Sequence, residues 1–368
     1  MTLIKKLMIA FIVIAGIIAI ATVIFLNTER FGRHPSGEDL KEIAQSKNYK
    51  DGSFQNILPT PMLSEGVGYY EVLKEFFFSS KPKEPSSNIP SSKTDLKKLN
   101  PEENVLVWMG HSTYFMQLDG KTILVDPVLS GYASPLFFTT KAFKGTDIYT
   151  VEDFPAIDYL FLTHDHWDHM DYNTLKELKP KIKKVITGLG NGSHLKRWGF
   201  SQETIVEGDW YDSITLDTGF TAHVTPARHF SGRGFTRGKT LWASFVISSK
   251  SANIYLGGDS GYGPHFKEIG NKFGPFDLAI LENGQYDEKW KNIHMLPGEQ
   301  LLAAADLGAT SILPVHAAKF TLANHDWNEP LEKISKASKS SDLRIITPKI
   351  GDKVNLMDKF QVFENWWQ

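Results

Sequence analysis

The sequence predicts an α/β protein in which two β-sheets are covered by helices, preceded by one membrane-spanning helix. Two observations support this prediction: residues 7–26 form an uncharged apolar run, and from residue 105 onward β-hairpins alternate with strand–helix units. Hairpins mixed with strand–helix units bury their apolar faces when two sheets pack beneath outer helices. The 368 residues are expected to divide into a short basic N-terminus (1–6), an anchor (7–26), a polar lead-in and linker (27–104) and one large domain (105–368).

The composition excludes several classes of function. Lys and Arg number 40 against 42 Asp and Glu, so the formal net charge is −2 and the chain lacks the surplus of cations that binds nucleic-acid phosphates. There are no cysteines, which excludes disulfides, thiolate nucleophiles and cysteine-ligated zinc or iron–sulfur sites. A transition metal would therefore have to bind His, Asp and Glu, and the chain has 12 His.

The apolar run at residues 7–26 reads LMIAFIVIAGIIAIATVIFL. As a helix it would span about 30 Å, the thickness of a bilayer core. A cleaved signal peptide is the alternative, but its apolar core usually has only about 7–15 residues, so we favour an uncleaved single-pass anchor. Lys5 and Lys6 precede the run, which predicts an inside N-terminus and a large domain on the outer, extracytoplasmic face. Arg30 and Arg33 follow the run and oppose that orientation.

The lead-in that follows is polar and has no sustained hydrophobic period. Residues 70–78 (YEVLKEFFF) predict a short amphipathic helix. We expect its FFF triplet to be buried, because large apolar residues usually lie inside proteins. Residues 81–104 are rich in Pro, Ser and Lys, a composition typical of a linker or an exposed loop.

The large domain is predicted to alternate strands with helices. Asp119-Gly120 is typical of a two-residue hairpin turn, and Asp171 can cap a helix that carries Leu175 and Leu178. The expected strands are 105–109, 114–118, 122–125, 159–162, 184–186, 213–216, 221–225, 241–247, 253–256, 277–281 and 311–315. The expected helices follow Asp171 and Asn191 and occupy 297–307 and 329–337.

One loop concentrates potential metal ligands. THDHWDH, residues 163–169, directly follows an expected strand and offers four ligands within six residues. Neutral imidazoles and carboxylates are the ligands that Zn²⁺ accepts in the absence of cysteine. His164 and His166 can face one metal ion, while Asp168 and His169 can reach a second. The alternative is a polar surface loop, but three His and two Asp beside a strand end are unusual for such a loop.

Three later residues share this context, because each follows an expected strand. They are His229 in PARH, Asp259 in GGDSG and His316 in PVH. A lone His near a strand is usually structural, so each residue by itself has a simpler explanation. Jointly, they place six or seven ligand groups on one edge of the predicted sheets.

The order of these motifs resembles a known superfamily. HDHWDH followed by PARH, GGDSGY and PVH is similar to the metallo-β-lactamase superfamily. WMGHSTYF, TPARHFSGR, ENGQYDEKW and PVHAAKFTLANHDWNEP resemble its N-acylphosphatidylethanolamine-hydrolysing phospholipase D branch. The resemblance covers roughly residues 105–331 and implies a four-layered αβ/βα sandwich with two zinc ions at the edge between its halves. It implies one zinc on His164, His166 and His229, the other on Asp168, His169 and His316, and Asp259 bridging both.

Other histidines have weaker assignments. His294 matches a position near the scissile group in this branch, so we expect it to contact substrate; a histidine of a surface loop is the alternative. His111 is expected to orient a ligand, since ligating groups usually need a hydrogen-bonding partner. His223 lies within a strand pattern and is expected to be structural, whereas His265 and His325 have no assigned role.

This ligand set predicts a hydrolase. Two zinc ions about 3.5–4 Å apart would hold a bridging hydroxide as the nucleophile, with Asp168, Asp259 and His294 as the catalytic residues. The resemblance implies phosphodiester cleavage of an N-acyl phosphatidylethanolamine-like lipid at the bilayer. An apolar groove lined by Phe137, Phe138 and Trp210 would favour a lipid. The alternatives are a hydrolase of the same fold acting on a lactone, thioester, amide or nucleotide phosphodiester, and a binding protein that kept the fold, which the intact ligand set opposes.

Overall fold

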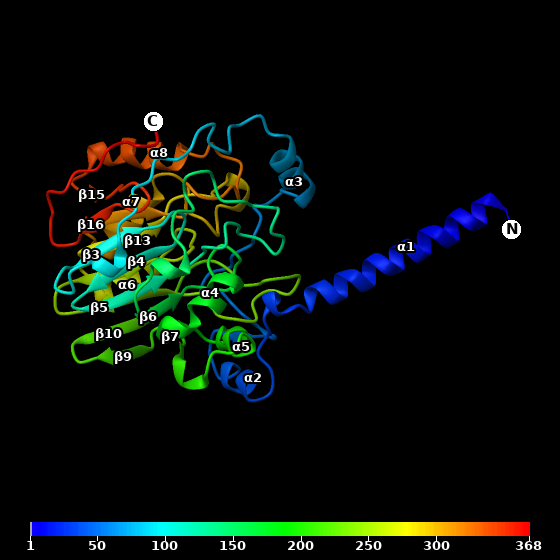
Figure 1. The fold of residues 1–368 in the computed structure, drawn as a ribbon, viewed down its shortest axis with the longest axis horizontal. Coiled ribbons are helices and arrows are strands. Elements are labelled where there is room, and N and C mark those ends of the chain that lie inside the picture. The colour runs from blue at the N-terminus through cyan, green and yellow to red at the C-terminus, as the bar shows by residue number, and fades with distance from the viewer. Residues whose placement is uncertain (1) are drawn as a thin grey trace.

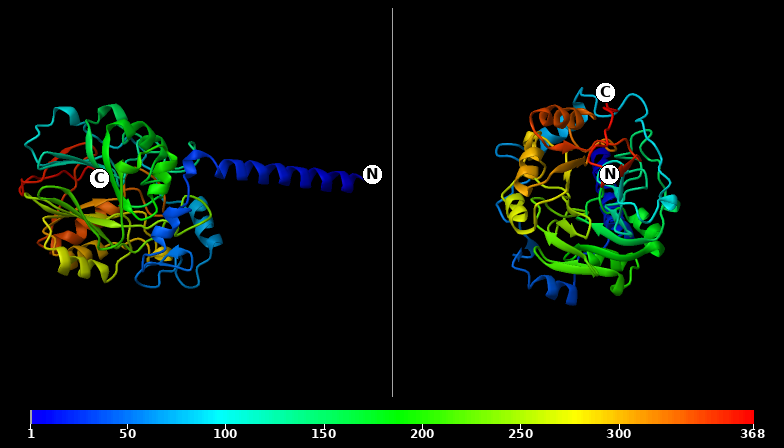
Figure 2. Two further views of the ribbon diagram at one scale, coloured as in Figure 1. Left: turned by 90° about the horizontal axis from the view of Figure 1, so that it is seen from below. Right: turned by 90° about the vertical axis from the view of Figure 1, so that its left-hand side faces the viewer.

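The computed structural model describes residues 2–368 and contains two seven-stranded sheets that face each other (Figures 1 and 2). The first sheet comprises, in spatial order, β16 (Lys353–Asn355), β3 (Val105–Trp108), β4 (Tyr114–Leu118), β5 (Lys121–Val125), β6 (Ile157–Leu162), β7 (Ile182–Gly188) and β8 (Ile205–Gly208). The second comprises β15 (Arg344–Ile345), β14 (Ser311–Val315), β13 (Leu278–Glu282), β12 (Asn253–Leu256), β11 (Ser244–Ser248), β10 (Phe220–Thr225) and β9 (Ser213–Asp217). In each sheet the antiparallel pairs come first in the chain and the parallel pairs follow, except that the last strand, β16, pairs antiparallel with β3.

Helices cover the outer faces of both sheets. The first sheet carries α4 (Tyr172–Leu178) and α5 (Gly192–Arg197), and the second carries α6 (His265–Phe273), α7 (Glu299–Leu307) and α8 (Glu329–Ala337). Asp171 caps α4 as expected, because its carboxylate accepts a hydrogen bond from the Asn173 N–H. The predicted αβ/βα sandwich is therefore confirmed.

Alternation along the strands separates three hydrophobic cores. In β3, Leu106 and Trp108 point into the core between the sheets, whereas Val107 points outward to the core beneath α4 and α5. In the second sheet, Tyr255 of β12 packs outward against Phe266 of α6. Period-2 alternation places successive side chains on opposite faces, so one strand serves two layers.

Most expected strands are present, with differences at their ends. The strand expected at 241–247 begins only at Ser244, because the preceding residues form a loop in which the Ala243 N–H donates to the Thr163 carbonyl. In the large domain, β8, α6, β15 and β16 were not predicted from the sequence, nor were the short helix and hairpin within residues 38–54 of the lead-in. Both β15 and β16 have only two or three residues, which is too short for a periodic pattern.

The N-terminal helix α1 (Leu3–Leu26) extends away from the rest of the molecule and has no buried residue (Figure 1). It is long and apolar enough to cross a membrane, a property that signal sequences near an N-terminus share. A short 3-10 helix, η1 (Glu29–Phe31), follows within three residues.

The lead-in contains α2 (Glu38–Ile43), the hairpin β1 (Tyr49–Lys50) and β2 (Ser53–Phe54), and α3 (Tyr69–Phe78). Despite its polar composition, three of its side chains, Ile43, Phe54 and Ile89, are buried and packed with the core between the sheets. The expectation that the FFF triplet is buried is wrong: Phe77 and Phe78 are 70% and 83% exposed. The helix α3 stands off the sheets, so no core is available to it (Figure 1).

Candidate metal centre

The seven sequence-predicted ligands meet at one edge of the two sheets. The loop of residues 163–169 follows β6, while His229 follows β10, Asp259 follows β12 and His316 directly follows β14. The strands β6, β10, β12 and β14 all end at this edge, as the carboxyl ends of strands do at the sites of α/β proteins. All seven side chains lie in two groups whose ligand atoms are within 4.8 Å of one another.

Three imidazole nitrogens converge in the first group. His166 Nδ1 lies 2.8 Å from His164 Nε2 and 3.2 Å from His229 Nε2. Asp259 Oδ2 lies 3.9 Å from His164 Nε2 and 3.8 Å from His229 Nε2. The same nitrogens therefore surround one point together with a carboxylate oxygen, which is the arrangement of a four-ligand metal site.

The outward nitrogens of two of these rings are already engaged. His164 Nδ1 lies 2.9 Å from Thr163 Oγ1, and His229 Nδ1 lies 2.9 Å from the carbonyl oxygen of Ile293. A hydrogen bond at one ring nitrogen fixes the tautomer and leaves the other nitrogen free to bind a metal. Both rings are thus oriented as ligands before a metal arrives.

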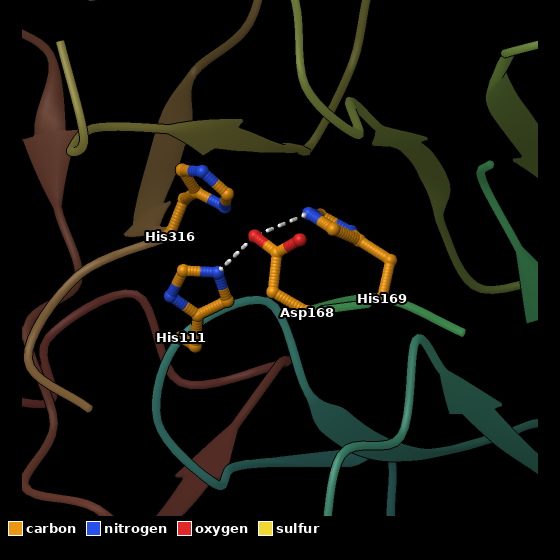
Figure 3. Close-up of side chains that lie close together, drawn as sticks. All are labelled: His111, Asp168, His169 and His316. Carbon is orange, nitrogen blue, oxygen red and sulfur yellow. Dashed lines mark hydrogen bonds and ion pairs between the residues drawn. The ribbon is translucent and has the colours of Figure 1, made fainter. Parts of the chain in front are cut away.

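The second group contains Asp168, His169 and His316, with His111 beside them (Figure 3). Asp168 Oδ2 lies between two rings, 2.9 Å from His111 Nε2 and 3.5 Å from His169 Nε2 (Figure 3). His111 is where the sequence analysis expected a partner of a ligand, and it is completely buried.

Asp259 lies between the two groups. Its Oδ1 is 3.1 Å from His316 Nδ1, and its Oδ2 is 3.1 Å from His169 Nε2. His169 Nε2 and Asp259 Oδ1 are buried but have no hydrogen-bond partner of suitable geometry. Buried polar atoms without partners are costly, and two divalent ions on either side of Asp259 would satisfy both atoms.

The charges of the site also fit divalent cations. Burial lowers the pKa values of His164, His229 and His316 well below the usual range, so these rings are neutral and able to bind a metal. Burial opposes a charge on His169, but the three carboxylates around it outweigh this effect and raise its pKa well above the usual value. Those carboxylates belong to Asp126, Asp168 and Asp259. Without a metal, His169 therefore carries a proton among these carboxylates, and bound divalent cations would supply the positive charge in its place.

Two further residues hold ligands in place, and the sequence analysis missed both. Asp126 Oδ2 lies 2.7 Å from His169 Nδ1 and accepts a hydrogen bond from Thr163 Oγ1 at 2.6 Å. Ser112 Oγ lies 2.9 Å from His316 Nδ1. Asp126 directly follows β5, so the rule that found the other ligands, a polar residue at a strand end, could have found it.

His294 lies at the rim of the site, where its ring is 5.1 Å from that of His229 and stacks on His316 at 5.2 Å. Its Nδ1 is 2.6 Å from Oε2 of Glu282, the last residue of β13. Burial raises the pKa of Glu282 to about 7 although His294 opposes this shift, and Glu282 raises the pKa of His294 against the effect of burial. Glu282 was missed too, although it also ends a strand.

The lead-in reaches the site through Asn56. Its amide nitrogen donates to the His229 carbonyl at 2.7 Å, and its amide oxygen accepts from the His229 N–H at 3.1 Å. Trp242 Nε1 also donates to this oxygen at 3.2 Å. Nothing in the sequence around Asn56 indicates this contact.

The remaining sequence assignments lie away from the metal groups. His223 stacks on Phe273, and its Nδ1 is 2.7 Å from Ser213 Oγ. Trp210 does not line a groove with Phe137 and Phe138, because it is buried and its indole donates to the Trp242 carbonyl. Its size and apolarity make it a core residue once the sheets pack. His265 Nε2 lies 3.0 Å from Ser260 Oγ, and His325 Nε2 accepts from the Gln285 N–H at 2.8 Å.

Comparisons with known proteins agree with this geometry. Residues 121–317 match the family described as "Beta-lactamase superfamily domain". An uncharacterised protein of Mycobacterium tuberculosis (strain ATCC 25618 / H37Rv) is 34% identical over 88% of each chain. N-acyl-phosphatidylethanolamine-hydrolyzing phospholipase D 1 of Caenorhabditis elegans is 28% identical over 72% of this chain and 83% of its own.

Among solved structures, Igni18, a metallo hydrolase of the archaeon Ignicoccus hospitalis KIN4/I, has a TM-score of 0.52 and 22% identity, covering 68% of this chain and 97% of its own. This similarity concerns the fold. The metal-dependent hydrolases among the relatives agree with a site built from His and Asp. The chain therefore belongs to the metallo-β-lactamase superfamily, in the branch that contains the N-acylphosphatidylethanolamine-hydrolysing phospholipases D.

Proposed function

We propose that this protein is a membrane-anchored phosphodiesterase that binds two Zn²⁺ ions and cleaves N-acyl phosphatidylethanolamine-like lipids. The observation that supports it most is the position of Asp259 between two converging groups of imidazoles. The two groups hold one ion each in this proposal, and Asp259 contacts both. The C. elegans relative, whose name gives this lipid as its substrate, supports the choice of substrate.

Each group of the site has a role in this reaction. Zinc held by these residues would lower the pKa of a bound water and would neutralise charge on the phosphoryl oxygens. Asp168 and Asp259 hold the ions, and His111 orients Asp168 through its hydrogen bond. His294 is placed to give a proton from Nε2 to the leaving alcohol oxygen, because Glu282 holds its Nδ1.

A cavity beside the site has both apolar and polar walls, which suits an amphiphilic substrate such as a phospholipid. It has a volume of about 580 Å³ and lies between the lead-in and the loop after β10. Phe230 forms part of its wall and packs against the rings of His166 and His229. Its other apolar lining residues are Phe54, Ile57, Leu58, Pro59, Met62 and Trp242, and its polar side chains are Ser53, Gln55, Asn56, Thr60 and Arg237.

The residues directly after the anchor contact the metal-binding loop, and Phe25 of α1 packs against one of them, Phe31, at 5.2 Å between ring centroids. Phe31, the last residue of η1, packs edge-on against Trp167 at 5.1 Å between ring centroids, and Trp167 lies between ligands His166 and Asp168 in the sequence. In this proposal residues 7–26 anchor the protein, residues 27–104 are the lead-in, and residues 105–368 form the hydrolase domain. The domain lies on the outer face of the membrane, which a C-terminal reporter active on only one side tests directly.

An assay of the full-length chain tests the proposed reaction. Purified protein in mixed micelles of N-acyl phosphatidylethanolamine should release N-acylethanolamine, lose this activity on chelation and regain it with Zn²⁺. A lactone, a thioester, an amide and a nucleotide phosphodiester serve as competing substrates in the same assay. Turnover of one of these, with none of the lipid, would replace the proposed substrate while leaving the hydrolase assignment in place.

A further inference from the structure

Exposed aromatic side chains gather in three segments that are far apart in the sequence. Within the described residues after the anchor, exposed phenylalanines occur at six positions, and five of them lie in α3, in the loop of residues 131–142 and in the loop of residues 231–238. These five are Phe77, Phe78, Phe137, Phe138 and Phe235, with exposed fractions of 70%, 83%, 67%, 58% and 87%. The sixth, Phe360, lies near the C-terminus.

Two of these segments form hydrogen bonds with Arg30 of η1, which follows the anchor. The Arg30 guanidinium donates to the Pro135 carbonyl at 2.7 Å, next to the Phe137–Phe138 pair. The Arg30 carbonyl accepts from Arg233 at 2.8 Å, two residues before Phe235. Both aromatic loops therefore flank the point at which the chain leaves α1.

The third segment, α3, lies at the same end of the molecule. Figures 1 and 2 show α3 on the side of the domain from which α1 projects. An ion pair of 2.5 Å between Glu75 and Lys289 joins α3 to the loop that carries His294. The aromatic segments thus surround the end of the molecule that also holds the candidate metal centre.

The distance between anchor and domain leaves little room for solvent. Only Asn27 and Thr28 separate the end of α1 from η1, whose Phe31 packs against the domain. The three Cα–Cα steps from Leu26 to Glu29 span at most about 10 Å. An anchor that crosses a bilayer would thus bring these loops to the headgroup region. A cavity of about 400 Å³ between Leu26 and Phe235 is lined there by two exposed guanidinium groups, those of Arg33 and Arg197, which suit lipid phosphates.

We propose that these residues form a membrane-docking face, defined as Phe77, Phe78, Phe137, Phe138 and Phe235, which inserts into the lipid interface and seats the domain on the bilayer. Phe is among the side chains with which peripheral segments enter that interface, and a group of exposed apolar side chains marks an interaction surface. The inference rests on the proposed anchoring by α1 and deepens the proposed function, because a lipid would enter the site from the bilayer without crossing water.

The absence of cysteine makes a direct test simple. Single substitutions Phe78→Cys, Phe138→Cys and Phe235→Cys in the full-length chain receive an environment-sensitive fluorophore, and the protein is reconstituted into phosphatidylcholine–phosphatidylglycerol vesicles. We expect quenching by nitroxide-labelled lipids and little quenching by aqueous iodide at all three positions. Phe360→Cys, at a side chain that is 91% exposed, is the matched control and should show the reverse.

A fourth label separates this inference from the anchoring on which it rests. Ile18→Cys, in the middle of α1, should be quenched by lipids whenever the anchor spans the bilayer. Lipid quenching at residue 18 with iodide quenching at residues 78, 138 and 235 would overturn the docking face alone. Iodide quenching at residue 18 as well would overturn the anchoring. Shielding of the three face positions from both quenchers, with energy transfer between labelled chains, would show that a second copy covers the face and would also overturn the proposal.

A functional variant gives an independent readout. Phe137→Ser combined with Phe138→Ser should reduce turnover of the lipid in vesicles several-fold while metal content and thermal unfolding stay unchanged. Turnover of the same lipid in detergent micelles, where no bilayer surface is needed, should be unaffected. Equal losses in vesicles and micelles would contradict a docking role.

Discussion

The two halves of the sandwich build the candidate metal centre in different ways. The first half supplies four ligands from one loop, residues 163–169, whereas the second half supplies three ligands from three separate loops. In the local loop Asp126 holds His169 and His111 holds Asp168, while His229 depends on Asn56 from the lead-in. Ligands that are close in sequence are positioned by local backbone geometry, and dispersed ligands are positioned by contacts across the fold.

The largest effect is expected at the residue that joins the two halves. Asp259→Asn keeps the size of the side chain but removes the charge between the two groups. Loss of a residue that only hydrogen-bonds a metal ligand costs about 10- to 100-fold in activity. Turnover of Asp259→Asn should fall by more than this, and bound zinc should fall below two ions per chain. Turnover assays and metal analysis measure both effects. Asp168→Asn, which lies in one group only, is the comparison and should cost a single ion; near-normal turnover of Asp259→Asn would contradict the bridging position.

The next largest effect concerns the partner of the local loop. Asp126→Asn weakens the hydrogen bond to His169 Nδ1 and leaves the backbone of the loop in place. We expect zinc affinity to fall about 10- to 100-fold, measured by competition with a chelating indicator. An unchanged affinity would show that the loop backbone alone orients His169.

A smaller effect is expected at the lead-in. Asn56→Ala removes both hydrogen bonds to the His229 backbone and should lower the free energy of unfolding by about 1–3 kcal/mol. Zinc affinity should fall together with stability, because the loop after β10 becomes less ordered. Asn48→Ala is the control, since Asn48 is in the same lead-in but bonds to Asp209, away from the site. If both variants lose zinc equally, the lead-in acts only through general stability.

The smallest effect at neutral pH concerns the support of the Asp259 loop. Burial lowers the pKa of His265, whose Nε2 contacts Ser260 Oγ, to about 3. The unfolded chain takes up a proton near pH 6.5 and the folded chain only near pH 3. Above about pH 6.5, His265 is neutral in both states and does not reduce the free energy of unfolding. As the pH falls from about 6.5 to about 3, the free energy of unfolding decreases by about 1.4 kcal/mol per pH unit. Urea unfolding of the metal-free chain should show that His265→Gln reduces this acid sensitivity.

His223→Gln serves as the matched variant for this measurement. His223 is half-buried on the outside of β10, and burial lowers its pKa as well. Its removal should change the pH dependence of unfolding less than removal of His265, because water still reaches the ring. Equal changes in the two variants would contradict a special role for the buried His265.

Much of the candidate site could be predicted from the sequence because it follows a local rule. Polar residues directly after apolar strands gave all seven ligand candidates, and Asp126 and Glu282 obey the same rule although they were missed. Asn56 could not be found this way. It lies 173 residues from His229 in the chain, and only the packing of the lead-in on the domain brings the two together.

The burial of large aromatic side chains, by contrast, could not be predicted from the local sequence. Hydrophobicity alone predicts a buried FFF triplet in α3 and a groove that includes Trp210. In the fold, Phe77 and Phe78 are exposed while Trp210 is buried. Whether a large apolar side chain is covered depends on what the rest of the chain places next to it, and this cannot be seen in a window of nearby residues.

The sequence by itself determined most strands and helices of the large domain, the apolar N-terminal helix and the ligand-bearing strand ends. Each of these depends on residues that are neighbours in the chain. Only the tertiary structure decided that Asp259 lies between two groups of imidazoles, that Asn56 holds His229, and that three aromatic segments lie beside the anchor. These features arise from contacts between distant segments, which form only when the two sheets pack and the lead-in folds onto them.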